Sequence, residues 1–417
     1  MKSLLIRNLA QVATPVGFAA RKGEAMGDIR LYTDAAIWIK DGRIWEVGDS
    51  QELTQRAVAS DEELKVIDAQ SQCAVPGFVD PHTHFLFGGA RAEEFDARLR
   101  GVPYMELLAR GGGIVSTMQH TRQASEKELL RIGMNTLSSM LSLGYTTIEG
   151  KSGYGLDLKT ELKLLKVMGQ LQEKQPVDIV RTYLGAHAVP PEYKGRSGEY
   201  IQWIIDEVLP VIKKEKLAEF VDVFCEKGVF TNEESERLLA VAKYMGFAIK
   251  LHADEMTSTG GAGLGCTLGA VSADHLLAIS DADIARLGAG DTVAVLLPAT
   301  AFCMRKAFAP ARRLLEAGAA VALASDFNPG SCYTYSLPLI FGLAVIAMNM
   351  TAAEALTACT LNAAAAINRA DFIGSIEKGK QGDIVLLDVP DYRYLSYKTG
   401  INLVKTVIKN GEIVHVN

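Results

Sequence analysis

The sequence lacks the features of a secreted, membrane-spanning or nucleic-acid-binding protein. Its six cysteines are scattered without a CxxC pair, which is typical of reduced cytosolic thiols rather than of a disulfide framework. No run of about 18 apolar residues could span a bilayer, and the N-terminus has no full signal-peptide core. The 43 basic and 49 acidic residues give a formal net charge of −6 without a long run of one sign. This balance argues against nucleic acid or an anionic membrane as the partner, and a cytoplasmic location is expected.

The two ends of the chain resemble each other. At 417 residues with 48% hydrophobic side chains, the chain is long enough for one large barrel domain and a small second one. Each end carries alternating apolar stretches around a two-residue turn signal, Asp41-Gly42 near the start and Asn410-Gly411 near the finish. Because a hairpin alone is marginally stable, we expect both ends to form one small β-sandwich domain from residues 1–75 and 378–417.

The middle of the chain, residues 76–377, alternates short apolar strands with amphipathic helices. The predicted strands are 77–82, 146–150, 178–186, 221–226, 248–254, 272–277, 292–298 and 320–326. Each strand is apolar on both faces, which is typical of parallel strands covered by helices. We therefore expect an α/β fold with a (β/α)8 TIM-like barrel. A doubly wound open sheet is the alternative, since periodicity alone does not show that a sheet closes.

Polar side chains gather where the predicted strands end, which is where barrel enzymes carry their catalytic groups. The first strand ends in Asp80-Pro81-His82-Thr83-His84, the fifth in His252-Ala253-Asp254-Glu255, the sixth in Asp274-His275 and the last in Ser325-Asp326. Two histidines two residues apart on a strand face the same side, so both imidazoles reach one metal ion. A third histidine and a carboxylate would complete a site suited to zinc or iron. A cation there would lower the pKa of a bound water towards neutrality and supply a hydroxide nucleophile.

Each of these residues also has an ordinary structural interpretation. A lone His-x-His pair arises by chance, His252 or His275 alone would be a hydrogen-bonded core histidine, and Asp326 alone would be a helix N-cap. Only the joint pattern indicates a metal site. The histidines at predicted strand ends are His82, His84, His187, His252 and His275. His120 and His415 lie elsewhere, and we interpret them as surface or packing residues.

The motifs themselves are typical of one known family. PGFVDPHTH after a strand-rich start, HADE on a later strand, an isolated histidine on the next and SD on the last make the chain similar to the amidohydrolase superfamily over essentially its whole length. Within it, the chain most resembles the enzymes that open the imidazolone ring in histidine breakdown. The stretches that carry this resemblance are FGGARAEEFDARLRG, GGGIVST, EGKSGYGLD, YLGAHAVPPEY, KLHADEMTSTGGAGL and SDFNPGS.

The resemblance implies a set of site residues. One zinc or iron ion would be held by His82, His84, His252 and Asp326. Catalysis would be carried out by Glu255, His275 and Asp326. The substrate would be contacted by Arg91, Tyr154, His187, Glu255, Asn328, Gly330 and Ser331. Related enzymes bridge two metals through a carboxylated lysine, and Lys227, just past the fourth strand, is the candidate for that role; the resemblance implies a mononuclear site.

The reaction that the resemblance implies is hydrolysis of the cyclic amide bond of 4-imidazolone-5-propanoate to N-formimidoyl-glutamate. Arg91 would bind the carboxylate tail, or else form a surface salt bridge with Glu93 or Glu94. Asp326 or Glu255 would accept the proton of water, and Glu255 would protonate the departing ring nitrogen while His275 polarises the carbonyl. A homodimer would suit a barrel enzyme of this size.

Other functions compete with this interpretation. A ring aminohydrolase of the same superfamily would use a similar set of metal ligands, so these ligands do not discriminate between the two. A non-catalytic scaffold that keeps the fold and loses the metal is a second alternative. A phosphate-binding barrel is a third, because residues 260–265 read GGAGLG, although this stretch follows a histidine-bearing strand and is better explained as a flexible active-site loop.

Overall fold

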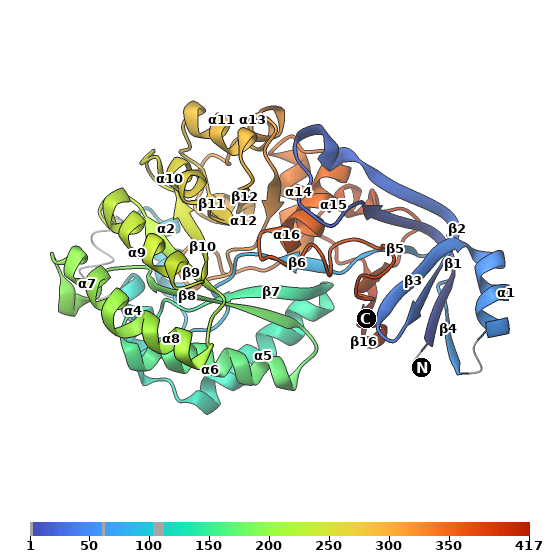
Figure 1. The fold of residues 1–417 in the computed structure, drawn as a ribbon, viewed down its shortest axis with the longest axis horizontal. Helices are drawn as coiled ribbons and strands as arrows, with labels where there is room; N and C mark the ends of the chain where they lie inside the picture. Colours follow the sequence, from blue (N-terminus) through green and yellow to red (C-terminus); the bar gives the residue numbers. More distant parts are fainter. Residues whose placement is uncertain (1–2, 61–62, 103–111) are drawn as a thin grey trace.

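The eight predicted barrel strands all form, in sequence order around one parallel sheet. The computed structural model describes residues 3–60, 63–102 and 112–417. The barrel strands are β6 (Phe78–Asp80), β7 (Tyr145–Lys151), β8 (Asp178–Ala186), β9 (Phe220–Cys225), β10 (Ala248–Ala253), β11 (Ser272–His275), β12 (Val293–Leu296) and β13 (Val321–Leu323). Every neighbouring pair is parallel, and helices surround the sheet (Figure 1).

The segments that follow β6 and β13 join the two ends of this sheet. Thr83 and Phe327 form a parallel bridge, and the Asp326 amide donates to the His82 carbonyl at 3.0 Å. The His84 amide donates to the Phe327 carbonyl at 2.9 Å. Because consecutive strands are neighbours and the ends are joined, the sheet is a closed barrel, and the doubly wound alternative is wrong.

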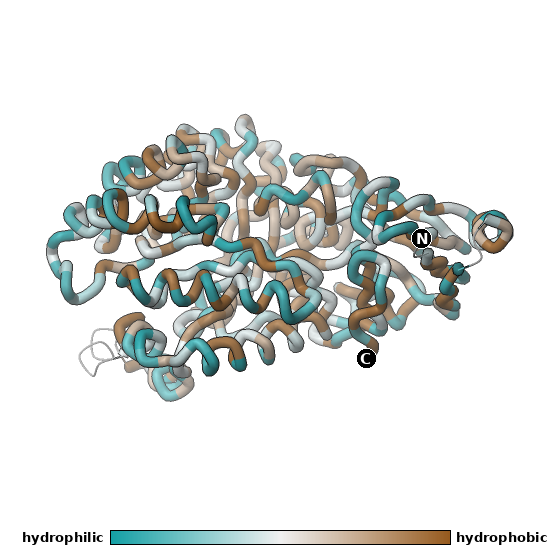
Figure 2. Tube along the Cα trace, turned by 60° about the horizontal axis from the view of Figure 1, so that its bottom comes forward, coloured by the Kyte–Doolittle hydropathy of each residue, from teal (hydrophilic) through white to brown (hydrophobic). Residues whose placement is uncertain are grey.

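Several of the helices around the barrel begin at side-chain caps. Ser125, Asp157, Thr231, Ser280 and Thr351 each accept a hydrogen bond from the amide three residues later. The helices are α2 (Ala92–Leu99), α4 (Ile114–Gln123), α5 (Glu126–Ser142), α6 (Leu158–Lys174), α7 (Ser197–Trp203), α8 (Leu209–Glu215), α9 (Asn232–Tyr244), α10 (Gly261–Leu268), α11 (Asp281–Ala289), α12 (Pro298–Cys303), α13 (Ala311–Glu316), α14 (Leu337–Ile346), α15 (Ala352–Cys359) and α16 (Leu361–Ala365). Hydrophilic and hydrophobic residues alternate along the helices that face the viewer in Figure 2, as expected for amphipathic helices on a sheet.

The two chain ends combine in one mixed sheet beside the barrel (Figure 1). Its strands are β1 (Ser3–Pro15), β2 (Ile29–Lys40), β3 (Arg43–Asp49), β4 (Leu64–Asp68), β5 (Cys73–Pro76), β14 (Ile384–Leu387), β15 (Val404–Lys409) and β16 (Glu412–Val416), with α1 (Ser50–Ser60) packed against β2. β14 pairs antiparallel with β5, which links the two ends of the chain. Both predicted turns form with left-handed backbone, at Asp41-Gly42 and Asn410-Gly411. The domain limits at residues 76 and 377 stay a prediction.

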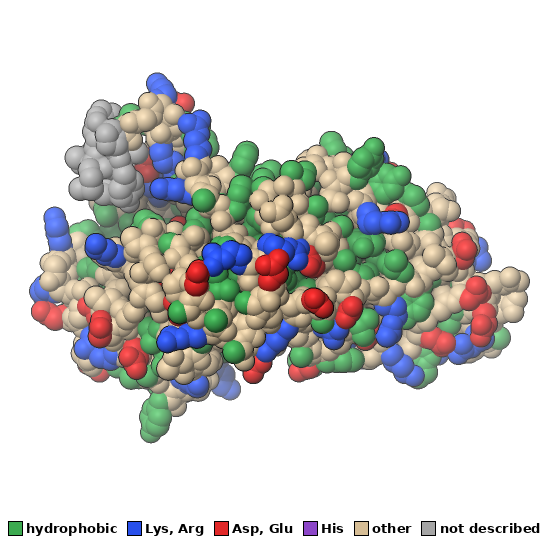
Figure 3. All heavy atoms as spheres, turned by 90° about the horizontal axis from the view of Figure 1, so that it is seen from above, with side chains coloured by type: hydrophobic (Ala, Val, Ile, Leu, Met, Phe, Trp, Pro, Cys, Tyr) green, Lys and Arg blue, Asp and Glu red, His purple; other side chains and the backbone are tan. Residues whose placement is uncertain are grey.

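An ion pair made by the buried Lys409 holds this sheet against the bottom of the barrel. Lys409 on β15 donates to Asp383 and to Asp178, the first residue of β8, at 2.6 Å each. On the face drawn in Figure 3, basic and acidic side chains are interspersed over the surface. Among the described residues, no helix is long and apolar enough to cross a membrane.

Candidate active site

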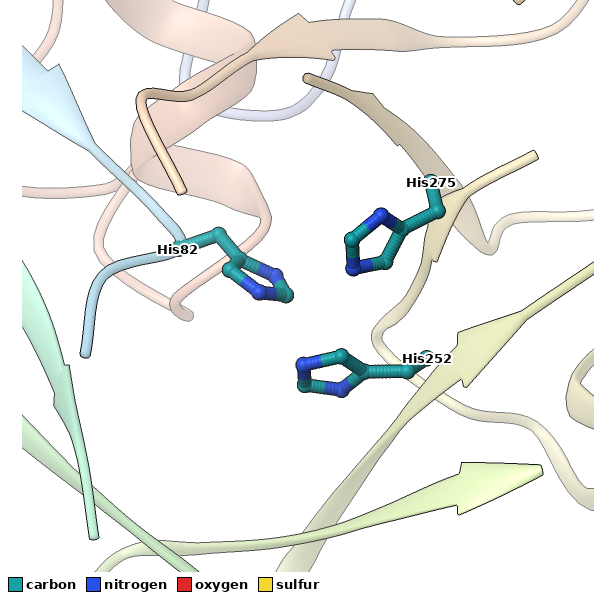
Figure 4. Close-up of side chains that lie close together, drawn as sticks. All are labelled: His82, His252 and His275. Atoms are coloured by element: carbon teal, nitrogen blue, oxygen red, sulfur yellow. The ribbon is translucent and has the colours of Figure 1, made fainter. Parts of the chain in front are cut away.

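Four predicted histidines meet inside the C-terminal end of the barrel. His82 follows β6, His84 lies two residues later, His252 is on β10 and His275 ends β11. All four are at most 2% exposed. The rings of His82, His252 and His275 point into one common space (Figure 4). The structure therefore brings these four predicted residues together, since the ends of parallel strands around a barrel face the same opening.

The ring nitrogens of this cluster lie close enough to share a cation. The Nε2 atoms of His252 and His84 are 3.3 Å apart. A carboxylate oxygen of Asp326 lies 3.6 Å from Nε2 of His82 and 3.5 Å from Nε2 of His84. The groups that could hold a metal are His82–His252–His275, His84–His187–His252, His82–His84–Asp326 and His82–Glu149–Asp274. Among the described residues, each of the four predicted ligands thus lies close to two or more of the others, and His275 and His187 border the same space.

The donor set fits a metal ion, because imidazole nitrogens and a carboxylate oxygen converge on one space. The Nε2 atom of His82 and both ring nitrogens of His275 are buried without a hydrogen-bond partner among the described residues. Burial lowers the pKa of His82 and of His84 well below the usual range, so both rings are neutral and able to ligate. Buried nitrogen lone pairs beside a carboxylate are costly unless a cation satisfies them. The cluster is therefore typical of an amidohydrolase metal site.

Asp326 is held in place by a residue that the sequence pattern did not reveal. The Thr300 hydroxyl on α12 donates to the Asp326 carboxylate at 2.7 Å. Burial raises the pKa of Asp326 to about 6, although the Thr300 hydroxyl lowers it. Asp326 itself has a positive φ of 52°, which turns the backbone sharply after the last strand. It does not cap a helix, so the alternative interpretation of this residue is wrong.

Glu255 and His275 lie side by side at the edge of the histidine cluster. One Glu255 carboxylate oxygen is 3.7 Å from Nδ1 of His275. Burial, together with the carboxylates of Asp326 and Glu226, raises the pKa of Glu255 to about 8. Buried Glu226 accepts a hydrogen bond from the amide of Met256 at 2.9 Å and so fixes the residue after Glu255. The arrangement provides a carboxyl group able to carry a proton near neutral pH.

Tyr154 and His187 form an aromatic wall beside His84. The His84 and His187 rings are stacked with centroids 4.9 Å apart, and the Tyr154 ring lies 5.3 Å from that of His187. The Gly153 carbonyl is 3.1 Å from Nδ1 of His187. Burial lowers the pKa of His187 to about 3, so its ring is neutral. Two of the residues expected to contact substrate thus lie next to a predicted metal ligand.

Asn328 organises the loop that follows Asp326. Its amide nitrogen donates to the Asp326 carbonyl at 2.6 Å, and its carbonyl oxygen accepts from the amides of Gly330 and Ser331 at 2.8 Å each. These hydrogen bonds hold Gly330 and Ser331 in the loop that follows Asp326. Most of the hydrogen-bonding capacity of Asn328 is used within the loop, so its side chain acts first by shaping that loop.

Arg91 forms an ion pair with Glu94 at the mouth of the barrel. Its Nε donates to Glu94 at 3.0 Å, and its Nη2 contacts the other carboxylate oxygen. Its Nη1 end lies toward Gly330, where an added Cβ would come within 2.6 Å of it. Arg91 therefore forms one of the two predicted salt bridges. The same salt bridge directs its guanidinium toward the loop that is expected to bind substrate.

Several other predicted features lie away from the cluster. Lys227 is exposed in the turn after β9. A lysine that bridges two metal ions would have to point into the cluster, so Lys227 does not have that role. His120 is exposed and His415 is half-buried, as predicted for surface or packing residues. The glycine-rich stretch forms the start of α10. The Ala262 amide there donates to the Asp254 carboxylate at 3.0 Å, so this amide is already bound and the stretch does not form a phosphate site. Of the GGGIVST motif, Gly111 lies outside the described residues.

Sequence reasoning also missed a layer of charged residues below the histidines. Lys151 on β7 and Lys250 on β10 point into the barrel and are fully buried. They meet three fully buried carboxylates: Glu149, Asp222 and Asp274. The charged residues of this layer are spread over several strands, so the sequence carried no signal that they meet.

The chain is similar to known enzymes over its whole length. The model of the amidohydrolase family matches residues 73–414. The imidazolonepropionase of Clostridium tetani is 51% identical over 413 residues, covering 99% of this chain and 98% of that protein. The imidazolonepropionase of Parabacteroides distasonis is 52% identical over 410 residues, covering 98% of each chain.

Solved structures agree with the fold. The zinc-bound adenosine deaminase of Xanthomonas campestris superposes with a TM-score of 0.71 at 19% identity, covering 100% of this chain and 93% of the deaminase. The E. coli guanine deaminase gives 0.73 at 13% identity and covers 100% of both chains. At such identities these two show the shared architecture alone. By its family model and by its relatives at half identity, this chain belongs to the imidazolonepropionases of the amidohydrolase family.

Proposed function

We propose that this chain hydrolyses the ring amide of 4-imidazolone-5-propanoate in histidine degradation, giving N-formimidoyl-L-glutamate. The convergence of His82, His84, His252 and Asp326 on one buried space is the observation that carries the proposal. The similarity to the two imidazolonepropionases over nearly the full chain supports this substrate.

In this proposal a single zinc or iron ion is held by these four residues, since imidazole and carboxylate together suit either metal. When bound, the metal lowers the pKa of a water molecule and acts as a Lewis acid towards the carbonyl. His275 stays outside the ligand set and donates a hydrogen bond to the substrate carbonyl oxygen. Burial lowers the pKa of His275 well below its usual range, which keeps it a neutral donor.

Arg91 binds the propionate tail of the substrate, because a guanidinium pairs with a carboxylate through two parallel hydrogen bonds. Its ion pair with Glu94 fixes the side chain before substrate arrives. Tyr154 and His187 pack against the ring, and the loop of Asn328, Gly330 and Ser331 closes the other side. Positioning of this kind holds the amide carbon at the cluster.

Glu255 carries the proton in this mechanism. Water gives up a proton to Glu255 or Asp326 as its oxygen attacks the ring carbonyl carbon. Glu255 then protonates the ring nitrogen, and the bond between that nitrogen and the carbonyl carbon breaks. A pKa near 8 suits both steps, because the group exists in both protonation states near neutral pH.

The test is an absorbance assay with freshly prepared imidazolone propionate, together with metal analysis of the same sample. Loss of the substrate absorbance with formation of formimidoyl-glutamate, at about one metal per chain, is the expected result. A metal-loaded chain that leaves this substrate intact but releases ammonia from a nucleobase would support the aminohydrolase alternative. A chain that takes up neither zinc nor iron would support the scaffold alternative.

The proposal includes a cytoplasmic homodimer. Six free cysteines are consistent with a reducing compartment. Light scattering of the purified chain tests the assembly, since a mass near the 45.0 kDa of one chain would contradict a dimer.

A further inference from the structure

We propose that the five buried charged residues below the histidines are a positioning network for the metal site, not only a structural ion cluster. These residues, here called the inner ion cluster, are Glu149, Lys151, Asp222, Lys250 and Asp274. The inference rests on the proposed metal site. It assigns two carboxylates the task of orienting two of the ligand histidines, and two lysines the task of holding those carboxylates.

Each of the two carboxylates contacts the far side of one histidine ring. Asp274 lies 2.6 Å from Nδ1 of His82, and Asp222 lies 3.0 Å from Nδ1 of His252. A carboxylate at Nδ1 retains the hydrogen there, so Nε2 presents its lone pair. Nε2 is the atom of each ring that faces the cluster: that of His82 toward Asp326, and that of His252 toward His84. Asp274 through its hydrogen bond, and Asp222 through its negative charge beside Nδ1, thus favour the tautomer that each ring needs for ligating a cation.

Lys151 connects these two carboxylates. Its ammonium is 2.6 Å from Asp222, 3.0 Å from Glu149 and 3.6 Å from Asp274. The lysine therefore spans from the carboxylate of one ligand histidine to that of the other. If either Asp222 or Asp274 moved, the Lys151 ammonium would move with it and would no longer hold the other carboxylate in place.

Lys250 anchors the cluster to the strand that carries the first ligands. Its ammonium donates to Glu149 at 2.7 Å and to the Pro81 carbonyl at 2.8 Å, one residue before His82. It also lies 3.8 Å from Asp274. Glu149 accepts from the Thr182 hydroxyl as well, which ties the cluster to β8. The network thereby fixes both the ring of His82 and the backbone next to it.

The composition of the inner ion cluster favours a cation above it. All five side chains are fully buried, and two ammonium groups face three carboxylates, a formal charge of 2 − 3 = −1. Burying charges is costly even when they are paired, and a well-packed apolar layer would stabilise the barrel at least as well. An excess carboxylate in this place has a function if a metal ion lies on the other side of the histidines.

The experiment measures metal binding by the full chain, independently of turnover. Wild type, Asp274→Asn and Asp222→Asn are stripped of metal and isolated as folded protein by gel filtration. Each is then titrated with Co²⁺, whose visible absorption reports ligand geometry, and its zinc affinity is measured by competition with a chelator. We expect each variant to lose about 10- to 100-fold in zinc affinity and to change its Co²⁺ spectrum.

Asp383→Asn is the matched control, because Asp383 is also buried and bound to a lysine, Lys409, but lies outside the barrel interior. It is expected to lower the melting temperature and to retain wild-type zinc affinity. Equal loss of affinity in Asp383→Asn, or wild-type affinity and spectrum in both cluster variants, would overturn the positioning role. If Asp274→Asn yields no folded chain, Asp222→Asn decides the outcome through the other histidine. A wild-type chain that binds no metal would instead refute the proposed site itself.

Discussion

The Nε2 atoms of His84 and His252 lie 3.3 Å apart inside the barrel, with a carboxylate oxygen of Asp326 3.5 Å from that of His84. When two neutral imidazoles face each other in this way, at least one of the two facing nitrogens carries a lone pair and no hydrogen. Neither ring is exposed by more than 2%, so water does not screen the contact. A cation between the rings would let both nitrogens act as ligands together with Asp326, whereas without it only one of them can accept a hydrogen bond from the other.

Removal of the metal is therefore predicted to destabilise the folded chain. At free zinc one hundred times the dissociation constant, the bound form gains about 2.7 kcal/mol. Differential scanning fluorimetry with and without a chelator should show a lower melting temperature for the stripped protein and recovery when zinc returns. His84→Ala should abolish this response, whereas His120→Ala on the surface should keep it. The same melting temperature in both states would contradict a metal in this cluster.

Glu255→Gln is predicted to reduce kcat by about 10²- to 10⁴-fold, the usual contribution of a general acid or base. Glutamine keeps the size of the side chain and its place beside His275, but it carries no titratable proton. Turnover and metal content are measured on the same sample, so that loss of metal is not mistaken for loss of chemistry. Glu236→Gln on the exposed side of α9 is the control. Near-normal kcat in Glu255→Gln would remove this residue from the mechanism.

Arg91→Ala is predicted to act through the substrate tail. A charge-assisted hydrogen bond contributes about 1.5 to 3 kcal/mol, equivalent to roughly 10- to 100-fold in kcat/KM. The loss should appear mainly in KM and should spare a ring analogue that has no carboxylate. Arg100→Ala, next to the same helix but largely exposed, should leave both substrates unaffected. Equal losses for the two substrates would show that Arg91 supports the fold of the loop instead.

Glu94→Gln tests how the ion pair prepares Arg91. Glu94 accepts from Arg91 and also from the Gly113 amide at 2.8 Å. With the charge removed, the guanidinium is less restrained, and we expect KM to rise with little change in kcat. A fall in kcat without a change in KM would contradict a role confined to the tail.

The sequence pattern revealed the histidines and Asp326 at the upper end of the barrel but not the charged residues in its interior, for a physical reason. Residues such as His82 and Asp326 follow apolar strands, and the ends of parallel strands meet at one opening whatever the exact registers are. Lys250 instead lies within β10 and Lys151 is the last residue of β7, and alternation along a strand does not distinguish the barrel interior from the helix-covered outside. Their partners are 71 and 101 residues away along the chain, so only the closed barrel reveals the pairs.

The carboxylate of Glu354 allows a prediction about pH that is independent of the metal. It accepts from Arg312 at 2.7 and 3.1 Å and from the Thr351 amide at 2.7 Å in a capping box at the start of α15. Burial alone would raise the pKa of Glu354, but the hydrogen bonds and charge of Arg312 lower it below its ordinary value. A lowered pKa stabilises the fold at pH values above the unfolded pKa of about 4.3, and this contribution disappears as pH falls through the folded pKa.

Glu354→Gln should therefore be less stable than wild type at neutral pH and approach it in acid. Hydrogen bonds to a charged group contribute about 1.5 to 3 kcal/mol, and we expect the lower end because Arg312 is 35% exposed. Melting temperatures of both proteins, measured from pH 7 downwards, should differ by a constant amount to about pH 5 and converge below about pH 4. Glu199→Gln, which breaks an exposed pair with Arg196, should change little at any pH. A difference for Glu354→Gln that stays constant down to the acid limit would mean that the carboxylate charge does not contribute.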